Sequence, residues 1–187
     1  SPGINCTLLK TMVGDKQRGE PFDNVKVPGQ NILGRLNEGW PILGKVLGQA
    51  MVAQCAEMVG GMKQVLEMTV DYAKQRIAFG HPIGSFEAIQ FNCADMVTDI
   101  DGCSFITYEA AWRLSEGLPA TQEIAMAKAW ASEKFRGVAT VSHQIHGAMG
   151  LCEDHDLPLY FKRARTWESN FGDANFHLDE IAKAVGI

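Results

Sequence analysis

The chain has 187 residues, of which 46% are hydrophobic and 21% charged, and its formal net charge is −5 at pH 7. A globular chain of this length buries roughly 70% of its unfolded surface, so these values predict a domain with a real core and not a disordered chain. The negative charge argues against a nucleic-acid partner, which needs a broad basic face, although a few Arg or Lys residues can still bind an anion locally.

Residues 1–37 are rich in residues that break helices. Extended runs at 4–9 and 22–27 lie between the breaks, and the second run alternates apolar and polar side chains. This pattern predicts short β-strands joined by turns. Two or three strands are not stable alone in water, so we interpret 1–37 as the end of a β domain that includes further strands. The breaking residues are Pro2, Gly14, Pro21, Pro28 and Gly34.

From residue 38 the apolar residues recur with helical spacing as far as Gly80, where the run Gly80-His81-Pro82 ends the pattern. At ~1.5 Å per residue, such a helix is roughly 50 Å long or more. Gly60 and Gly61 lie in its middle, although each glycine costs about 1 kcal/mol in helix propensity. They indicate a close helix crossing, a ligand that approaches the backbone, or a bend.

Three further ranges and the end of the chain also have helical periodicity. Ser85 and Thr121 are candidate caps for the second and third helices. The predicted ranges are 85–115, 121–146 and 157–170, followed by a fifth helix from about Asp173. Long helices joined by short breaks predict a mainly α fold: an up-down helix bundle over 38–187, preceded by the short β segment over 1–37.

Cysteine usage and apolar runs narrow the class of protein further. The five cysteines are odd in number and form no C-x-x-C pair, which predicts free thiols instead of a disulfide framework or a zinc site. No apolar run approaches the ~20 residues that a membrane helix needs, so we expect no membrane span. The first residues do not have the pattern of a signal peptide.

The segment 76–90, RIAFGHPIGSFEAIQ, is a candidate anion site. Arg76 ends the first long helix, a Gly-Pro turn follows, and a new helix then begins. Arginine binds phosphate bidentately and a helix amino terminus adds N–H donors. The alternative is an arginine that interacts only with the dipole at the carboxyl end of its helix.

Two later segments carry weaker signals. Closely spaced glycines in 144–150, QIHGAMG, let a backbone approach a ligand, or simply turn the chain after a helix. In the segment 157–165, LPLYFKRAR, three cations lie within four residues. They form either an anion site or the solvated face of a helix.

In combination these segments resemble the acyl-CoA dehydrogenases, a family of flavin enzymes. Residues 76–90 are similar to the family's helix–turn–helix junction, 144–150 to its Q-x-x-G-G-x-G loop, and 11–34 to the exit of its middle β domain. The resemblance covers nearly the whole chain and identifies 38–187 with the family's carboxyl-terminal helical domain. Glu87 departs from the pattern, because the family usually has Gln there and a negative charge is unsuited to an anionic cofactor.

The resemblance implies FAD as the cofactor. Arg76 and Phe79 match residues that contact the FAD of a neighbouring subunit in this family. Gln144, Gly147 and Ala148 match the loop that contacts the adenosine part, with Ala148 in place of a glycine.

The resemblance also implies an activity and partners. The family removes a proton from the α-carbon of an acyl-CoA thioester and transfers a hydride from the β-carbon to the flavin. It implies an electron-transfer flavoprotein as the electron acceptor, and self-association to a dimer or tetramer, or assembly into a hetero-oligomer. The implied location is the cytoplasm of a bacterium or the mitochondrial matrix of a eukaryote. The acyl chain cannot be named from the sequence.

The catalytic residue is unknown, because neither position that the family uses for its catalytic Glu holds a carboxylate in this chain. Phe171 matches the common position and Ala50 the position used by a minority of members. Three explanations stay open. The chain is a partner subunit whose companion supplies the base, or a displaced carboxylate acts, or the chemistry has been lost. The candidate carboxylates are Asp173, Glu168 and Glu57. Asp173 is also a candidate cofactor contact and the candidate cap of the last helix.

Two other classes of protein share this architecture. A ferritin-like metal bundle needs Glu-x-x-His motifs, which do not occur, and the pair His143 and His146 is more typical of a polar patch than of a metal site. The second class is a helical oligomerisation module, which would self-associate in the same way but bind no cofactor. We expect the isolated chain to bind FAD weakly or not at all, and to oxidise no acyl-CoA.

Overall fold

The computed structural model describes residues 3–187. These residues form two compact units, the first ending at Leu47 and the second running from Gly48 to Ile187. Helix α1 (Trp40–Gln75) begins in the first unit and continues in the second. The domain boundary at residue 37 stays a prediction.

The first unit contains a small antiparallel hairpin of β1 (Thr7–Leu9) and β2 (Gln17–Gly19). Thr11 closes the turn between the strands, because its hydroxyl donates to the Asp15 carbonyl over 3.0 Å. A single 3-10 turn at Gly29–Asn31 follows. Two strands bury too little apolar surface to be stable by themselves. Both leucines of β1, Leu8 and Leu9, are exposed.

The predicted strand at 22–27 is wrong. Phe22 forms only an isolated bridge to Ile4, and Asn24 then adopts a φ of +50°, which ends the extended conformation. The hairpin register places 17–19 opposite β1 and Phe22 opposite Ile4, and the pairing does not continue because the chain turns at Asn24. The alternating pattern therefore lies on an exposed segment, and Phe22 is 69% exposed.

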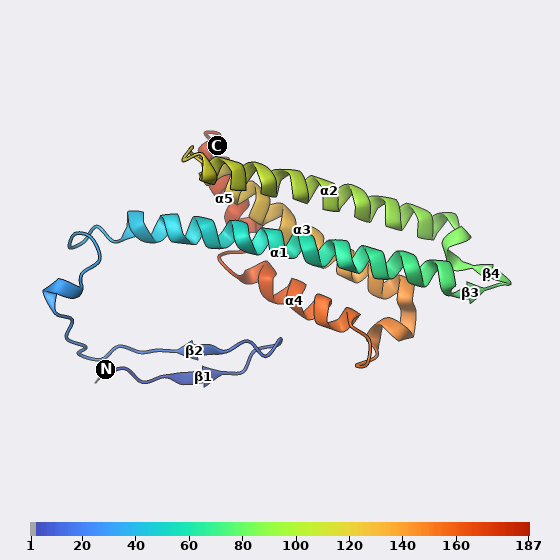
Figure 1. The fold of residues 1–187 in the computed structure, drawn as a ribbon, viewed down its shortest axis with the longest axis horizontal. Coiled ribbons are helices and arrows are strands. Elements are labelled where there is room, and N and C mark those ends of the chain that lie inside the picture. Colours follow the sequence, from blue (N-terminus) through green and yellow to red (C-terminus); the bar gives the residue numbers. More distant parts are fainter. Residues whose placement is uncertain (1–2) are drawn as a thin grey trace. The chain divides into compact units, whose positions relative to one another are not determined.

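The second unit is a bundle of helices, and this confirms the predicted mainly α, up-down architecture (Figure 1). Helix α3 packs against α2, α4 and α5. The short hairpin β3–β4 joins α1 to α2, and 3-10 turns at Ile83–Ser85 and Gly147–Leu151 precede α2 and follow α3. None of the helices in residues 3–187 has the length and apolar character needed to cross a membrane. The elements after α1 are β3 (Ile77–Ala78), β4 (His81–Pro82), α2 (Glu87–Ser115), α3 (Thr121–His146), α4 (Leu157–Ser169) and α5 (Ala174–Ala184).

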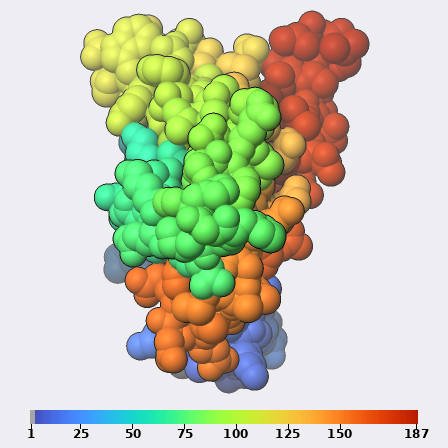
Figure 2. Space-filling view, turned by 90° about the vertical axis from the view of Figure 1, so that its right-hand side faces the viewer, coloured from blue at the N-terminus to red at the C-terminus, as the bar shows by residue number. Residues whose placement is uncertain are grey.

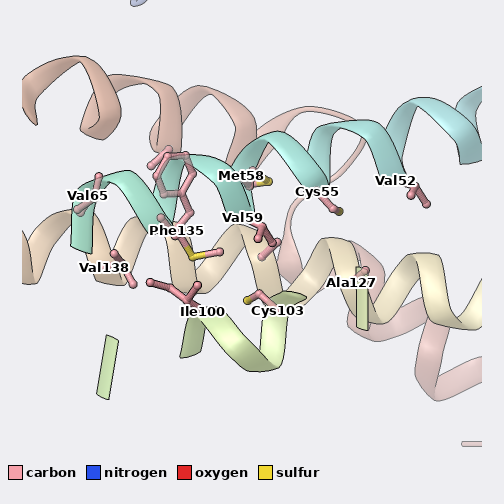
Figure 3. Packing of buried hydrophobic residues seen from close by; sticks show 14 of the residues in the cluster. Val52, Cys55, Met58, Val59, Val65, Ile100, Cys103, Ala127, Phe135 and Val138 are labelled. Carbon is pink, nitrogen blue, oxygen red and sulfur yellow. The ribbon is translucent and has the colours of Figure 1, made fainter. Parts of the chain in front are cut away.

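The core of this unit is formed by the apolar faces of α1, α2 and α3 (Figure 3). Phe135 of α3 is fully buried and lies against Trp167 of α4, with ring centroids 6.1 Å apart. All five cysteines are free thiols, but Cys6 and Cys152 are exposed, whereas the sequence favours buried or half-buried thiols. Cys55 and Cys103 are core residues, and burial raises the pKa of each thiol to about 12, so both stay protonated and unreactive.

The glycine pair in α1 marks a close helix crossing. The helix continues unbroken through both residues. A Cβ atom at Gly61 would lie 2.7 Å from Cζ of Phe135, whereas a Cβ atom at Gly60 would meet no atom within 4 Å. Gly61 therefore allows the Phe135 ring to pack closely against α1, whereas Gly60 only lowers the helix propensity of α1.

This difference makes Gly61→Ala and Gly60→Ala a matched pair. We expect Gly61→Ala to lower the free energy of unfolding by about 1–3 kcal/mol, because the Phe135 ring is enclosed and cannot move aside freely. Gly60→Ala should raise it by up to about 1 kcal/mol through helix propensity. Urea unfolding monitored by circular dichroism measures both, and equal effects would contradict the close crossing.

The predicted caps have mixed outcomes. Ser85 does not cap α2, because its hydroxyl donates to a carbonyl within the preceding turn, and Phe86 precedes the helix without a side-chain cap. Thr121 is the first residue of α3, and Ala120 before it has no capping side chain. The prediction for Asp173 is confirmed: its Oδ1 accepts from the backbone N–H of the third residue of α5 over 2.9 Å.

Candidate functional site

The β3–β4 hairpin and the glycine corner (Gly147–Leu151) lie at the same end of the bundle. Tyr72, four residues before Arg76 on α1, contacts the last residue of α3, because its hydroxyl donates to the His146 carbonyl over 3.3 Å and the Tyr72 and His146 rings stack with centroids 4.4 Å apart. Figure 2 faces this end and shows the green surface of the hairpin segment beside the orange surface of the segment after α3. The two motifs that sequence analysis singled out as cofactor segments are therefore neighbours.

Arg76 and Phe79 are presented to the outside at this end. Arg76 is exposed and has no ion-pair partner among residues 3–187. Its carbonyl accepts from the N–H of Ile83 over 2.8 Å, which closes the hairpin. Phe79 is 93% exposed and has a φ of +53°. Left-handed backbone is unfavourable for a bulky residue, and strain of this kind is typical of functional positions.

The glycine corner exposes backbone beside the hairpin. Gly147 ends α3 with a φ of +59° and a ψ of −136°, a combination open to glycine but not to other residues. Gln144, Gly147 and Ala148 are all exposed. Gly150 is buried, and a Cβ atom there would lie 3.0 Å from Cβ of His146. The corner is therefore a tight turn whose backbone at Gly147 and Ala148 is accessible, next to the exposed Gln144 of the last turn of α3.

A buried polar network holds this corner to α1. The hydroxyl groups of Thr69 and Ser142 lie 2.6 Å apart, and Nδ1 of His146 lies 2.9 Å from the Ser142 carbonyl. A carbonyl only accepts, so Nδ1 carries the proton, and Nε2 is left without a hydrogen-bond partner among the described residues. Burial lowers the pKa of His146, which keeps the ring neutral at pH 7. His146 is thus a structural residue in this region.

The loop between α4 and α5 (170–173, the α4–α5 loop) lies at the opposite end of the bundle (Figure 1). Phe171 has a φ of +59° and is 42% exposed, and Gly172 has a φ of +99°. Nε2 of His177 donates to the Phe171 carbonyl over 3.0 Å. Burial lowers the pKa of His177, so the ring is neutral and this nitrogen carries its single proton.

Lys128 of α3 is fully buried behind this loop. Its ammonium group donates to Ser132 Oγ over 2.7 Å and to the carbonyls of Trp167 and Gly172, both over 3.1 Å. Eighteen residues of helix separate Lys128 from His146, which corresponds to about 27 Å at 1.5 Å per residue. The predicted site residues therefore fall into two groups at opposite ends, with Asp173 apart from the other proposed cofactor contacts.

A family model for the acyl-CoA dehydrogenase C-terminal domain matches residues 37–186. The chain belongs to this family. The resemblance stated from the sequence is thereby confirmed, and the five helices of the bundle are those of the family's C-terminal domain.

Relatives of known name include dehydrogenases and a reductase. The chain is 33% identical to acryloyl-CoA reductase (NADH) of Anaerotignum propionicum over 188 aligned positions, which cover 99% of this chain and 48% of the relative. It is 34% identical to the short-chain specific acyl-CoA dehydrogenase of Megasphaera elsdenii, over 77% of this chain and 38% of the relative. The chain therefore spans about half the length of the relatives that it matches, or less.

Solved structures of the family have the same fold. Butyryl-CoA dehydrogenase from Megasphaera elsdenii superimposes with a TM-score of 0.93 at 29% identity, over 98% of this chain and 49% of that one. The ChsE4–ChsE5 complex from Mycobacterium tuberculosis gives a TM-score of 0.90 at 30% identity, over 98% and 49% of the two chains.

Neither position at which the family resemblance predicts the catalytic Glu holds a carboxylate in this chain, and two of the three candidate carboxylates elsewhere already form other interactions. Ala50 on α1 and Phe171 cannot accept a proton. Asp173 caps α5, and Glu168 pairs with two arginines over 3.1 and 2.7 Å. Glu57 is exposed and lines a cavity of about 470 Å³ between α1 and α4. The assignment of these residues to catalysis stays a prediction.

Sequence analysis missed Lys128. Its position on α3 falls within the apolar spacing of Ile124, Ala131 and Phe135, where a charged residue is unexpected. A lone lysine in the apolar face of a helix is the signal that would have found it, because such a residue is buried only when its ammonium group has several acceptors.

Proposed function

We propose that this chain is the carboxyl-terminal part of an FAD-dependent acyl-CoA dehydrogenase, which performs α,β-dehydrogenation of an acyl-CoA thioester, and that it contributes FAD binding and subunit association. The observation that carries this proposal is the convergence of Arg76, Phe79 and the glycine corner at one end of the bundle. Membership of the family supports the reaction class.

The residues at this end fit an extended anionic cofactor. Arg76 offers an unpaired guanidinium for the FAD diphosphate. Phe79 presents an exposed aromatic face, and Gln144 with the backbone at Gly147 and Ala148 offers hydrogen-bonding groups for the adenosine part. When bound, FAD supplies the acceptor for the substrate's β-hydride. These residues bind and orient the cofactor, and none of them transfers a proton.

The separation of the two groups supports a cofactor shared between subunits. A ligand held at the Arg76 end lies too far along α3 to be the one beside the α4–α5 loop of the same chain. We therefore propose that the Arg76 end serves the FAD of a neighbouring subunit, whereas the loop faces the chain's own acyl site. Asp173 would then contact a different FAD molecule from the one at Arg76.

An exposed aromatic stripe on α2 supports self-association. Phe105, Tyr108 and Trp112 are spaced by three and four positions, and are 73, 66 and 52% exposed. Residues with this spacing share one helix face, and an apolar face of this kind marks an association surface. We propose a dimer or tetramer, with an electron-transfer flavoprotein as acceptor, in the cytoplasm of a bacterium or the mitochondrial matrix of a eukaryote.

The second candidate function is that of a partner subunit without a catalytic base of its own. Phe171 at the base position favours it, as does the likeness to a chain of the ChsE4–ChsE5 complex. In this case a companion chain supplies the carboxylate, and this chain contributes binding surface alone.

Arg76→Ala in the full-length protein tests the cofactor assignment. We expect FAD to bind about 10- to 100-fold more weakly, because a charge-assisted contact to phosphate is lost. The flavin-to-protein absorbance ratio after gel filtration measures this loss. Lys74→Ala is the matched control, because Lys74 is an exposed cation two residues away that pairs with Asp71 at 3.9 Å. Unchanged flavin content in the Arg76 variant would rule out the assignment, and a colourless, folded wild-type oligomer would favour an oligomerisation module.

A further inference from the structure

The backbone of the α4–α5 loop is strained and must be held in place. Phe171 has a φ of +59°, a left-handed conformation that is costly for a bulky side chain. Such a conformation persists only where the surrounding structure over-determines it. The contacts that impose it on Phe171 are therefore of interest, because they decide where the side chain at position 171 points.

Lys128 supplies the central contact. Its buried ammonium group donates to the carbonyls of Trp167 and Gly172 over 3.1 Å and lies 3.4 Å from that of Glu168. Trp167 and Glu168 belong to the last turn of α4, whose carbonyls lack partners within the helix and attract a cation. The same group thus closes α4 and fixes the loop that follows.

The neighbouring residues hold the rest of the loop. His177 donates to the Phe171 carbonyl over 3.0 Å, and Asp173 caps α5. A Cβ atom at Gly172 would lie 2.5 Å from the Phe176 ring, so only glycine fits there. His177 therefore holds Phe171, Lys128 holds Gly172, and the Asp173 side chain binds the start of α5, so that Lys128 connects the loop to the central helix α3.

We propose that Lys128 is a positioning residue for the acyl site: by binding the end of α4 and Gly172 together, it sets the direction of the side chain at position 171. The claim that Lys128 positions the loop is independent of function. The claim that position 171 faces an acyl-CoA rests on the proposed function.

The electrostatic setting agrees with this role. Burial lowers the pKa of Lys128, and the carboxylates of Asp173 and Glu168 offset part of that effect. His177 of α5 is the other titratable group beside the loop. Replacement of Lys128 by an apolar side chain of similar length would fill the space but leave buried carbonyls without a donor. The cation is therefore needed for the carbonyls it orders.

The test uses Lys128→Met and Lys128→Arg in the full-length protein, with Lys134→Met as the matched control. Lys134 lies on the same helix, is partly exposed and pairs with Asp99 over 3.2 Å. Hydrogen–deuterium exchange should rise about tenfold or more at the amides of Phe176 and His177 in Lys128→Met, because both amides donate to Asp173 at the end of this loop, and remain unchanged in the control. Lys128→Arg keeps a cationic donor and should restore part of the protection.

The functional readout combines each of these substitutions with Phe171→Glu in the full-length protein. Lys128→Met should then lower kcat about tenfold or more with little change in KM, because a misplaced base slows proton transfer without weakening binding. Unchanged exchange at the amides of Phe176 and His177 in Lys128→Met overturns the proposal, and if that variant does not fold, unchanged exchange in Lys128→Gln, which removes the cation and shortens the side chain, does so. Flavin content is measured in parallel: its absence from the wild type would refute the proposed function while leaving the exchange result to decide the role of Lys128.

Discussion

Phe171→Glu in the full-length protein should raise the rate of acyl-CoA dehydrogenation by about 100-fold or more. A positioned general base contributes roughly 10²–10⁴-fold to a proton transfer, and we propose that residue 171 occupies the position of the family's catalytic Glu. The loop is already built for it, because Lys128 and His177 hold the backbone in the left-handed conformation that any residue at 171 must adopt. Phe171 is 42% exposed, so the substitution removes little core packing.

Phe171→Gln is the control for this gain of function. Glutamine has the shape of glutamate but cannot accept the proton, so this variant should stay at the wild-type rate. Flavin bleaching by a series of acyl-CoA chain lengths measures the rate. If Phe171→Glu retains FAD and gains no activity, the acyl site of this chain is incomplete, and the partner-subunit account becomes the better one.

Phe135→Ala should lower the free energy of unfolding by about 3–5 kcal/mol, the range for deletion of a fully buried aromatic ring. Phe135 is 0% exposed and lies between Gly61 of α1 and Trp167 of α4. Its ring also borders the cavity between α1 and α4, so the space left by the substitution joins that cavity and stays unfilled. A loss of this size is a large part of the 5–15 kcal/mol that is typical of a folded protein.

Chemical denaturation of Phe135→Ala beside Phe91→Ala measures this effect. Phe91 of α2 is 61% exposed, and its substitution should change the free energy of unfolding by no more than about 0.5 kcal/mol. A loss below about 1 kcal/mol for Phe135→Ala would mean that α1, α3 and α4 do not pack around this ring.

Local sequence signals predicted the helices well and the strands poorly. The helical period over α1 to α5 is long, so chance matches are few, and the breaks at Gly80 and Gly147 follow from glycine and proline chemistry. The strand at 22–27 was wrong because two-residue periodicity does not decide which segment pairs with β1. Ser85 does not cap α2 because its hydroxyl bonds the Pro82 carbonyl instead, and Thr121 does not cap α3 because the helix begins one residue earlier than its capping position requires.

The candidate site was predictable only in part. Arg76, Phe79 and the glycine corner were identified from motifs, and the structure then placed them at the same end of the bundle, where Tyr72 of α1 contacts His146 of α3. The burial of Lys128 was indicated by its position in the apolar spacing of α3, but the three carbonyls near its ammonium group lie about 40 residues later in the chain and no local pattern identifies them. The exposure of Phe79 and the left-handed backbone at Phe171 were equally invisible, since both depend on the turn that each residue occupies.

By itself, the sequence determined the helical bundle, the family and the absence of a carboxylate at positions 50 and 171, since these depend on residue identity and on spacing along one chain. Only the tertiary structure decided that the proposed cofactor residues and the α4–α5 loop lie at opposite ends of α3, and that Lys128 holds the loop. The physical reason is that burial and hydrogen bonding join residues far apart in the chain, such as Lys128 with Gly172 and Tyr72 with His146. No local pattern records which of many polar groups will meet when the helices pack.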